Sequence, residues 1–156
     1  MSMEFDKSFS VVVGEEGYES NLRGDPGGLT IFGISGRYYP DLVRRMMSMS
    51  REDALMVAKA QYEKDYWNPA GCDKLSWPMC LLVFDTAVNM GEETARHMLA
   101  ESRGDWNSFM GIRRLRYETI AKSRPEEARF LPGWFNRLSN LEKAAREPLT
   151  KQEVDV

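Results

Sequence analysis

Cysteine and histidine are scarce in this chain of 156 residues, since Cys72, Cys80 and His97 are its only thiols and its only imidazole. A zinc site needs a set of about four suitable ligands, and no paired spacing of these residues supplies one. A Ser-His-Asp or Cys-His hydrolase would depend on His97 as its base, but residues 94–98 are typical of an ordinary helix. Carboxylates are therefore the side chains left for acid–base chemistry.

Long apolar runs are also absent, because no segment approaches the ~20 apolar residues of a membrane span. Residues 1–10 lack the basic-then-apolar layout of an export signal, so we expect synthesis in the cytoplasm without a signal peptide. The 24 acidic and 21 basic side chains leave a net charge of −3, which disfavours nucleic acid as a partner. Since 42% of the residues are hydrophobic and 29% charged, we expect a folded monomer, long enough for one domain with at most a small appended lobe.

The apolar pattern predicts a mainly α protein. Residues 3–16 form an amphipathic helix by periodicity, with apolar side chains at Phe5, Phe9, Val12 and Val13. Residues 18–35 read as turns and a small β-hairpin, since the Pro26-Gly27 turn signal precedes a short apolar run. Residues 79–90 are apolar around most of the helix, which predicts a buried central position. Further helices are predicted over 50–67, 92–101 and 106–123 and from residue 133.

Glu16 has an unusual position in the first helix. At ~100° per residue it projects near the middle of the apolar stripe, whereas Glu15 falls a quarter-turn or more to the side. Gly17 then ends the helix. Burial disfavours the charged form of a carboxylic acid, so we expect Glu16 to keep its proton near neutral pH. Asp25 follows in a polar, glycine-rich loop and is expected to stay ionised.

Two carboxyl groups with such different surroundings suit the hydrolysis of a glycosidic bond. One protonates the leaving oxygen, while the other stabilises the oxocarbenium-like centre or activates water. Thr30, in the predicted hairpin, is a candidate for orienting water or bonding a sugar. Spacing alone leaves a structural alternative open, in which Glu16 pairs with a lysine and the run from Asp25 to Gly28 is only a turn.

Several blocks of the sequence follow one another in a specific order. The helix over 5–17 leads to Asp-Pro-Gly-Gly-Leu-Thr at 25–30 and Gly-Ile-Ser at 33–35. Tyr66-Trp67, Cys72-Asp73 and Val-Phe-Asp-Thr-Ala-Val-Asn-Met-Gly at 83–91 come next. Together these blocks resemble glycoside hydrolase family 108, the lysozyme-like muramidases of phages and Gram-negative bacteria. Residues 113–117 and 133–138 resemble the companion C-terminal module, which is usually described as peptidoglycan-binding.

The resemblance implies a lysozyme-like helical domain with a small β-hairpin after the first helix. Residues 1–91 would form the catalytic part, and residues 92–156 a helical, peptidoglycan-binding part packed on it. The implied activity is that of an N-acetylmuramidase, which cleaves the β-1,4 bond between N-acetylmuramic acid and N-acetylglucosamine in peptidoglycan. The implied setting is the periplasm, during host lysis or during wall remodelling for secretion.

The same resemblance assigns roles to residues. Glu16 would be the general acid, and Asp25 would stabilise the charged centre or position water together with Thr30. Asn21 and Ser35, which belong to the same block, are expected to bind substrate. No metal or organic cofactor is needed for this chemistry.

One departure from the family pattern leaves the acid open between two neighbours. The family's histidine before the catalytic glutamate is Glu15 here, and an alignment anchored on Tyr18 would make Glu15 the acid. Glu16 is favoured by the ungapped match from Phe5, by the step to Asp25 and by its place on the apolar stripe. A negative charge on Glu15 would also help to keep Glu16 protonated, which is a hypothesis that Glu15→Gln tests.

Asp85 and Asn89 are the polar exceptions on the predicted buried helix, and they lie on one line of it at i and i+4. One interpretation is that they line a sugar cleft and bind substrate. The other is that they are buried polar groups that tie helices together. The sequence does not separate the two.

Two further functions stay open. A lytic transglycosylase uses a single glutamate, so an Asp25→Ala variant would stay active. A non-catalytic wall-binding or secretion-scaffold module is kept open by the altered motif Glu15-Glu16-Gly17-Tyr18.

Overall fold

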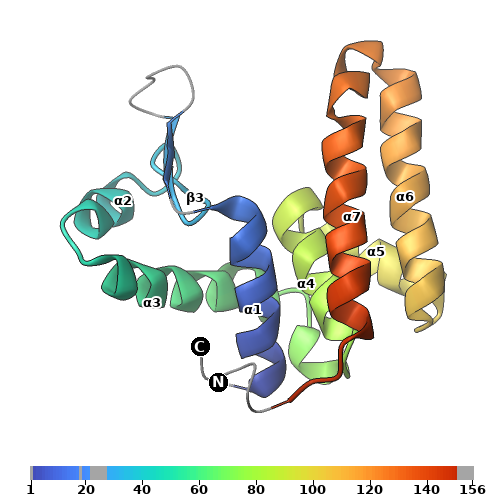
Figure 1. Ribbon diagram of the computed structural model, residues 1–156, viewed down its shortest axis with the longest axis horizontal. Helices are drawn as coiled ribbons and strands as arrows, with labels where there is room; N and C mark the ends of the chain where they lie inside the picture. Colours follow the sequence, from blue (N-terminus) through green and yellow to red (C-terminus); the bar gives the residue numbers. More distant parts are fainter. Residues whose placement is uncertain (1, 18, 22–27, 151–156) are drawn as a thin grey trace. The chain divides into compact units, whose positions relative to one another are not determined.

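The computed structural model describes residues 2–17, 19–21 and 28–150 (Figure 1). Helices dominate the described chain, and a small antiparallel sheet follows the first helix, which confirms the predicted fold class. Packing divides the chain into two compact units, Met1–Ser8 with Tyr66–Val156 and Phe9–Asp65, and each is described by itself. The elements are α1 (Met3–Glu16), β1 (Glu19–Asn21), β2 (Leu29–Ile31), β3 (Ile34–Ser35), α2 (Pro40–Met47), α3 (Arg51–Tyr62), η3 (Glu63–Trp67), η4 (Cys72–Lys74), α4 (Met79–Met90), α5 (Glu92–Ser102), α6 (Trp106–Ser123), η5 (Pro125–Phe130) and α7 (Leu131–Arg146).

The unit Phe9–Asp65 contains the sheet, whose strand order is β1-β2-β3. The turn between β2 and β3 holds Phe32 at φ 50° and Gly33 at φ 81°. A left-handed backbone is unfavourable for phenylalanine. Two interactions stabilise it: the Phe32 side chain is buried, and the Tyr62 hydroxyl donates a hydrogen bond of 2.6 Å to the Phe32 carbonyl. The ring of Tyr62 packs edge-on against Phe9, with a centroid distance of 5.4 Å.

The other unit is built around α4. Its residues from Met79 to Ala87 are all buried, as expected for a helix that is apolar on every side. Phe84 packs edge-on against Phe5 and Trp67, at centroid distances of 5.7 and 5.4 Å. Helices α5, α6 and α7 contact α4, and α6 and α7 lie side by side as a pair (Figure 1). The predicted central helix is thus confirmed.

Three local features differ from the sequence expectation. Helix α2 was not predicted, because its 8 residues bury only Val43 and Met46 and so leave a weak periodic pattern. The hairpin has a third strand, β3, of only two residues. The helix expected over 50–67 ends as an α-helix at Tyr62 and continues as a π-helical turn.

Both cysteines are buried free thiols. Burial is the main cause that raises the pKa of Cys80 to about 11. Burial raises the pKa of Cys72 further still. Neither thiol is therefore a nucleophile near neutral pH.

Candidate active site

The end of α1 carries the two candidate acids. Phe9 and Val12 of this helix are buried, which confirms the predicted apolar face. Glu16 is the last residue of α1, seven positions after Phe9, so its backbone lies about 20° from Phe9 around the helix axis. Gly17 follows at φ 77°, and its amide donates a hydrogen bond of 3.0 Å to the Val13 carbonyl. This glycine ends the helix as predicted.

The sheet brings two predicted site residues together. Thr30 lies directly opposite Ser35 across β2 and β3, so the two side chains share one face of the sheet. Thr30 also pairs with Ser20 on β1. The Ser35 hydroxyl accepts a hydrogen bond of 3.1 Å from the Arg37 amide. The hydroxyl side chains of Thr30 and Ser35 therefore lie next to each other on this face.

Two other predicted residues are described less fully. Asn21 pairs with Leu29 across β1 and β2, one register position from the Ser20–Thr30 pair. Asp25 lies outside the described residues, so its predicted role stays a prediction.

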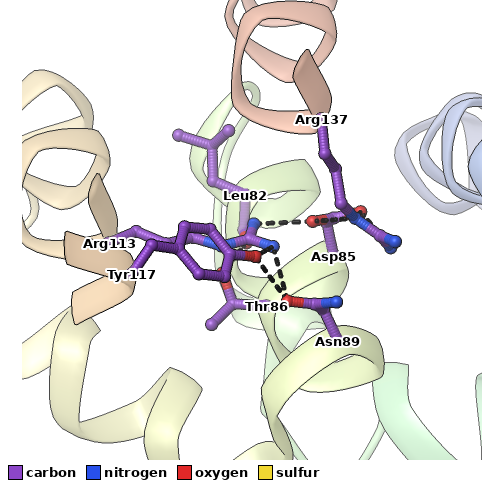
Figure 2. Close-up of polar contacts among 7 residues, drawn as sticks. All are labelled: Leu82, Asp85, Thr86, Asn89, Arg113, Tyr117 and Arg137. Atoms are coloured by element: carbon purple, nitrogen blue, oxygen red, sulfur yellow. Dashed lines mark hydrogen bonds and ion pairs between the residues drawn. The ribbon is translucent and has the colours of Figure 1, made fainter. Parts of the chain in front are cut away.

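Asp85, on α4, belongs to a polar network in the other unit (Figure 2). Its carboxylate has no exposed surface and forms ion pairs with two arginines. Arg113 of α6 places Nη1 2.6 Å from Oδ2, and Arg137 of α7 places Nη2 2.8 Å from Oδ1. The Arg137 Nε also donates to both carboxylate oxygens, at 3.1 and 3.2 Å. One carboxylate thus joins three helices.

Asp85 stays charged in this interior. Burial by itself raises the pKa of a carboxyl group. The positive charges of Arg113 and Arg137 and their hydrogen bonds outweigh that effect, so the pKa of Asp85 lies below its usual value. In this conformation Asp85 has no surface that could touch a sugar. Its geometry matches the interpretation as a tie between helices and not the interpretation as a substrate contact.

Asn89 differs from Asp85 because its side chain is exposed. Its Oδ1 accepts hydrogen bonds from the Tyr117 hydroxyl and, at 3.3 Å, from Nη2 of Arg113. The same Nη2 donates to the Tyr117 hydroxyl at 2.9 Å. Asn89 is therefore both held by the interior network and open to solvent.

The sequence pattern identified Asp85 and Asn89 but not their partners. Arg113 has no exposed surface and Tyr117 is 2% exposed, although both lie on a helix rich in charged residues. A lone acid on an otherwise apolar helix implies a cationic partner, because an unpaired buried charge is very costly. This reasoning predicts a buried cationic partner for Asp85 but does not identify which residue it is.

His97 lines a groove of about 430 Å³ between α5 and α6. The groove is lined by charged, apolar and threonine side chains, and no cysteine or serine is among them. The groove therefore does not contain the serine or cysteine of a Ser-His-Asp or Cys-His hydrolase beside His97. Within the described chain, no helix meets the length and hydropathy of a membrane span, and no three His, Cys, Asp or Glu side chains cluster as metal ligands.

Comparisons with known proteins agree with the sequence blocks. A family model described as Glycosyl hydrolase 108 matches residues 9–91, which include most of α1, the sheet and α4. The solved structure of Brucella abortus SagA is similar at a TM-score of 0.66 and 20% sequence identity, covering 94% of this chain and 98% of that chain. At that identity the similarity shows a common fold. No curated protein matches the sequence. The family match does not include the C-terminal helices, so their predicted wall-binding role stays a prediction.

Proposed function

This chain belongs to the glycosyl hydrolase 108 family, and from that membership we propose that it is an N-acetylmuramidase acting on peptidoglycan. The observation that carries the proposal is the family match over 9–91, which contains most of α1, the Asp25 to Gly28 motif and the sheet. The bond cleaved is the β-1,4 bond between N-acetylmuramic acid and N-acetylglucosamine. The resulting loss of glycan strands serves host lysis or local opening of the wall during secretion.

Glu16 is the general acid in this proposal. It gives its proton to the glycosidic oxygen as the bond to the anomeric carbon breaks, so the leaving sugar departs as a neutral alcohol. An acid in this role must be protonated near neutral pH, and the apolar register of α1 supports that requirement. The sequence neighbour Glu15 adds a negative charge that disfavours ionisation of Glu16.

Asp25 and Thr30 assist at the anomeric centre. A carboxylate at Asp25 stabilises the positive charge that develops there, or it takes a proton from the attacking water. Thr30 orients that water or bonds the sugar, and Ser35 opposite it contributes a second hydroxyl. Asn21, on the neighbouring strand, binds substrate at the same sheet.

Clearing of purified Gram-negative sacculi tests the assignment of the acid. The wild type is expected to lower turbidity and to release fragments with reducing muramic ends, seen by mass spectrometry. Glu16→Gln is expected to reduce the rate by about 10²–10⁴-fold. Glu15→Gln is the matched control, since it changes the adjacent carboxylate and is expected to shift only the acidic limb of the pH profile. Loss of activity in Glu15→Gln alone would mean that Glu15, and not Glu16, is the general acid.

Two other outcomes would replace the proposed activity. Fragments with anhydro-muramic ends, together with full activity of Asp25→Ala, would make the protein a lytic transglycosylase. Binding of the wild type to sacculi without clearing would make it a wall-binding or secretion-scaffold module.

A further inference from the structure

The direction of the Asn89 amide follows from the chemistry of its neighbours. Arginine has donors and no acceptor, so Arg113 Nη2 donates both to the Tyr117 hydroxyl and to Asn89 Oδ1. The Tyr117 oxygen accepts from the arginine, and its single proton is directed to the same Oδ1. The Asn89 oxygen must therefore face inward.

The two N–H groups of Asn89 consequently face the other way. Figure 2 shows the amide nitrogen of Asn89 directed away from Tyr117 and Arg113. Within the described residues Nδ2 has no hydrogen-bond partner, and the side chain is exposed. The surface thus presents two N–H donors in a fixed direction, while the only acceptor of the amide is already used.

The buried ion pairs hold this arrangement in place. Asp85 binds Nη1 of Arg113 at 2.6 Å, which leaves Nη2 of the same guanidinium directed to Tyr117 and Asn89. The Tyr117 ring is stacked on Trp134 of α7 at a centroid distance of 4.8 Å and an interplanar angle of 17°. Both donors to Asn89 are therefore fixed by neighbouring helices. A group held this way loses little conformational entropy when it binds a ligand.

We propose that Asn89 is a substrate-binding residue whose N–H groups donate to the acetamido carbonyl of an N-acetylated sugar, with Tyr117 and Arg113 as its positioning residues. The inference rests on the proposed function for the identity of the substrate. An amide that has only donors left to offer selects an acceptor. Each N-acetyl group carries a strong acceptor, its carbonyl oxygen. Asp85 has no exposed surface and supports Arg113 from the interior through their ion pair.

Replacement of Asn89 by aspartate separates binding from a structural role. Asn89→Asp keeps an oxygen for the bonds from Tyr117 and Arg113, yet it has no N–H to donate. We expect KM for sacculi to rise about three- to tenfold with kcat within about twofold of wild type. Asn107→Asp makes the same change at an exposed asparagine of α6 and is expected to leave both constants unchanged. Wild-type KM in Asn89→Asp would overturn the proposal.

The acetamido carbonyl is tested with chemically de-N-acetylated sacculi. Wild type is expected to lose affinity on this substrate, and Asn89→Asp to lose no more, because the group that Asn89 binds is gone. An additional loss from Asn89→Asp on the de-N-acetylated wall would overturn the acetamido assignment. Tyr117→Phe removes one of the two donors and is expected to raise KM in the same direction by a smaller factor.

Binding without turnover keeps the test independent of catalysis. Chitotetraose, an oligomer of N-acetylglucosamine, is titrated into the Glu16→Gln variant while the side-chain NH₂ resonances of asparagines are followed by NMR. The Asn89 NH₂ resonances are expected to shift and those of Asn107 to stay in place. An unmoved Asn89 signal during saturation of the protein would overturn the inference. If the Asn89 resonances shift but the wild type does not clear sacculi, the inference is retained and the proposed hydrolysis is rejected.

Discussion

Helices α1 and α4 end in the same way, yet they differ in the charged side chains that the elements next to them carry. Each is apolar on its inner face and is followed by a glycine with positive φ, Gly17 at 77° and Gly91 at 94°. Around α4, neighbouring helices bring two arginines and a tyrosine to Asp85 and Asn89. After α1 comes a sheet whose strands contain no lysine or arginine. Asp85 is therefore structural because two arginines pair with it, whereas the strands that follow α1 supply no cationic side chain.

The largest expected difference between the two helices is in stability. Asp85→Asn leaves Arg113 in the interior without the counter-charge of Asp85, and we expect the free energy of unfolding to fall by about 3–5 kcal/mol. Glu16→Gln is expected to change it by less than about 1 kcal/mol while removing activity. Urea unfolding followed by circular dichroism measures both. Equal losses in the two variants would remove the distinction between the helices.

The exposed pair between Arg44 and Asp41 is the control for charge removal in general. Its side chains are 76% and 89% exposed, so Asp41→Asn is expected to cost at most about 0.5 kcal/mol. A cost near that of Asp85→Asn would mean that burial is not the cause of the large effect.

The glycines that follow α1 and α4 are expected to have smaller effects. Gly91 has φ 94° and ψ 153°, a region almost restricted to glycine, so Gly91→Ala should cost about 1–3 kcal/mol. Gly17→Ala should cost about 1–2 kcal/mol, since Gly17 has a positive φ of 77°. A Cβ there meets nothing within 4 Å, so the cost comes from the backbone conformation and not from a clash. Gly111→Ala, inside α6, is the control and should stabilise the protein by about 0.5–1 kcal/mol. Thermal unfolding of the three variants provides the comparison.

The last prediction concerns acidic pH. The pKa of Asp85 in the folded protein lies below the ordinary value of 3.8. Its contribution to stability is therefore complete above about pH 4 and is lost as the pH falls through the lower, folded pKa. An NMR titration of the Asp85 carboxyl carbon should show no midpoint above 3.8. A midpoint above that value would mean that burial outweighs the two arginines.

The central part of the fold was predictable because its pattern is strong and local. Continuous apolar residues over 79–90 predict a buried helix, and α4 is buried as predicted. Helix α2 and strand β3 were not predictable, because one is 8 residues long and the other two. Strand β3 also depends on a left-handed Phe32, a conformation that the sequence disfavours and that the Tyr62 hydrogen bond stabilises from 30 residues away.

The candidate site was predictable in a similar, partial way. Thr30 and Ser35 were both predicted as site residues, and the sheet pairs them. The roles of Glu16 and Asp25 stay predictions, which the clearing assay tests. Asp85 and Asn89 looked alike in the sequence, but one proved to be buried and the other exposed.

The sequence by itself determined the helical class, the buried central helix, the glycine that ends α1 and the membership in a glycosyl hydrolase family. These properties follow from periodicity, backbone preferences and ordered motifs, which are local along the chain. Only the tertiary structure decided that Arg113, Tyr117 and Arg137 surround α4 and that the Asn89 amide faces outward. The physical reason is that a hydrogen bond or ion pair between helices depends on which faces pack together, and residues 24 to 52 positions apart carry no local record of that choice.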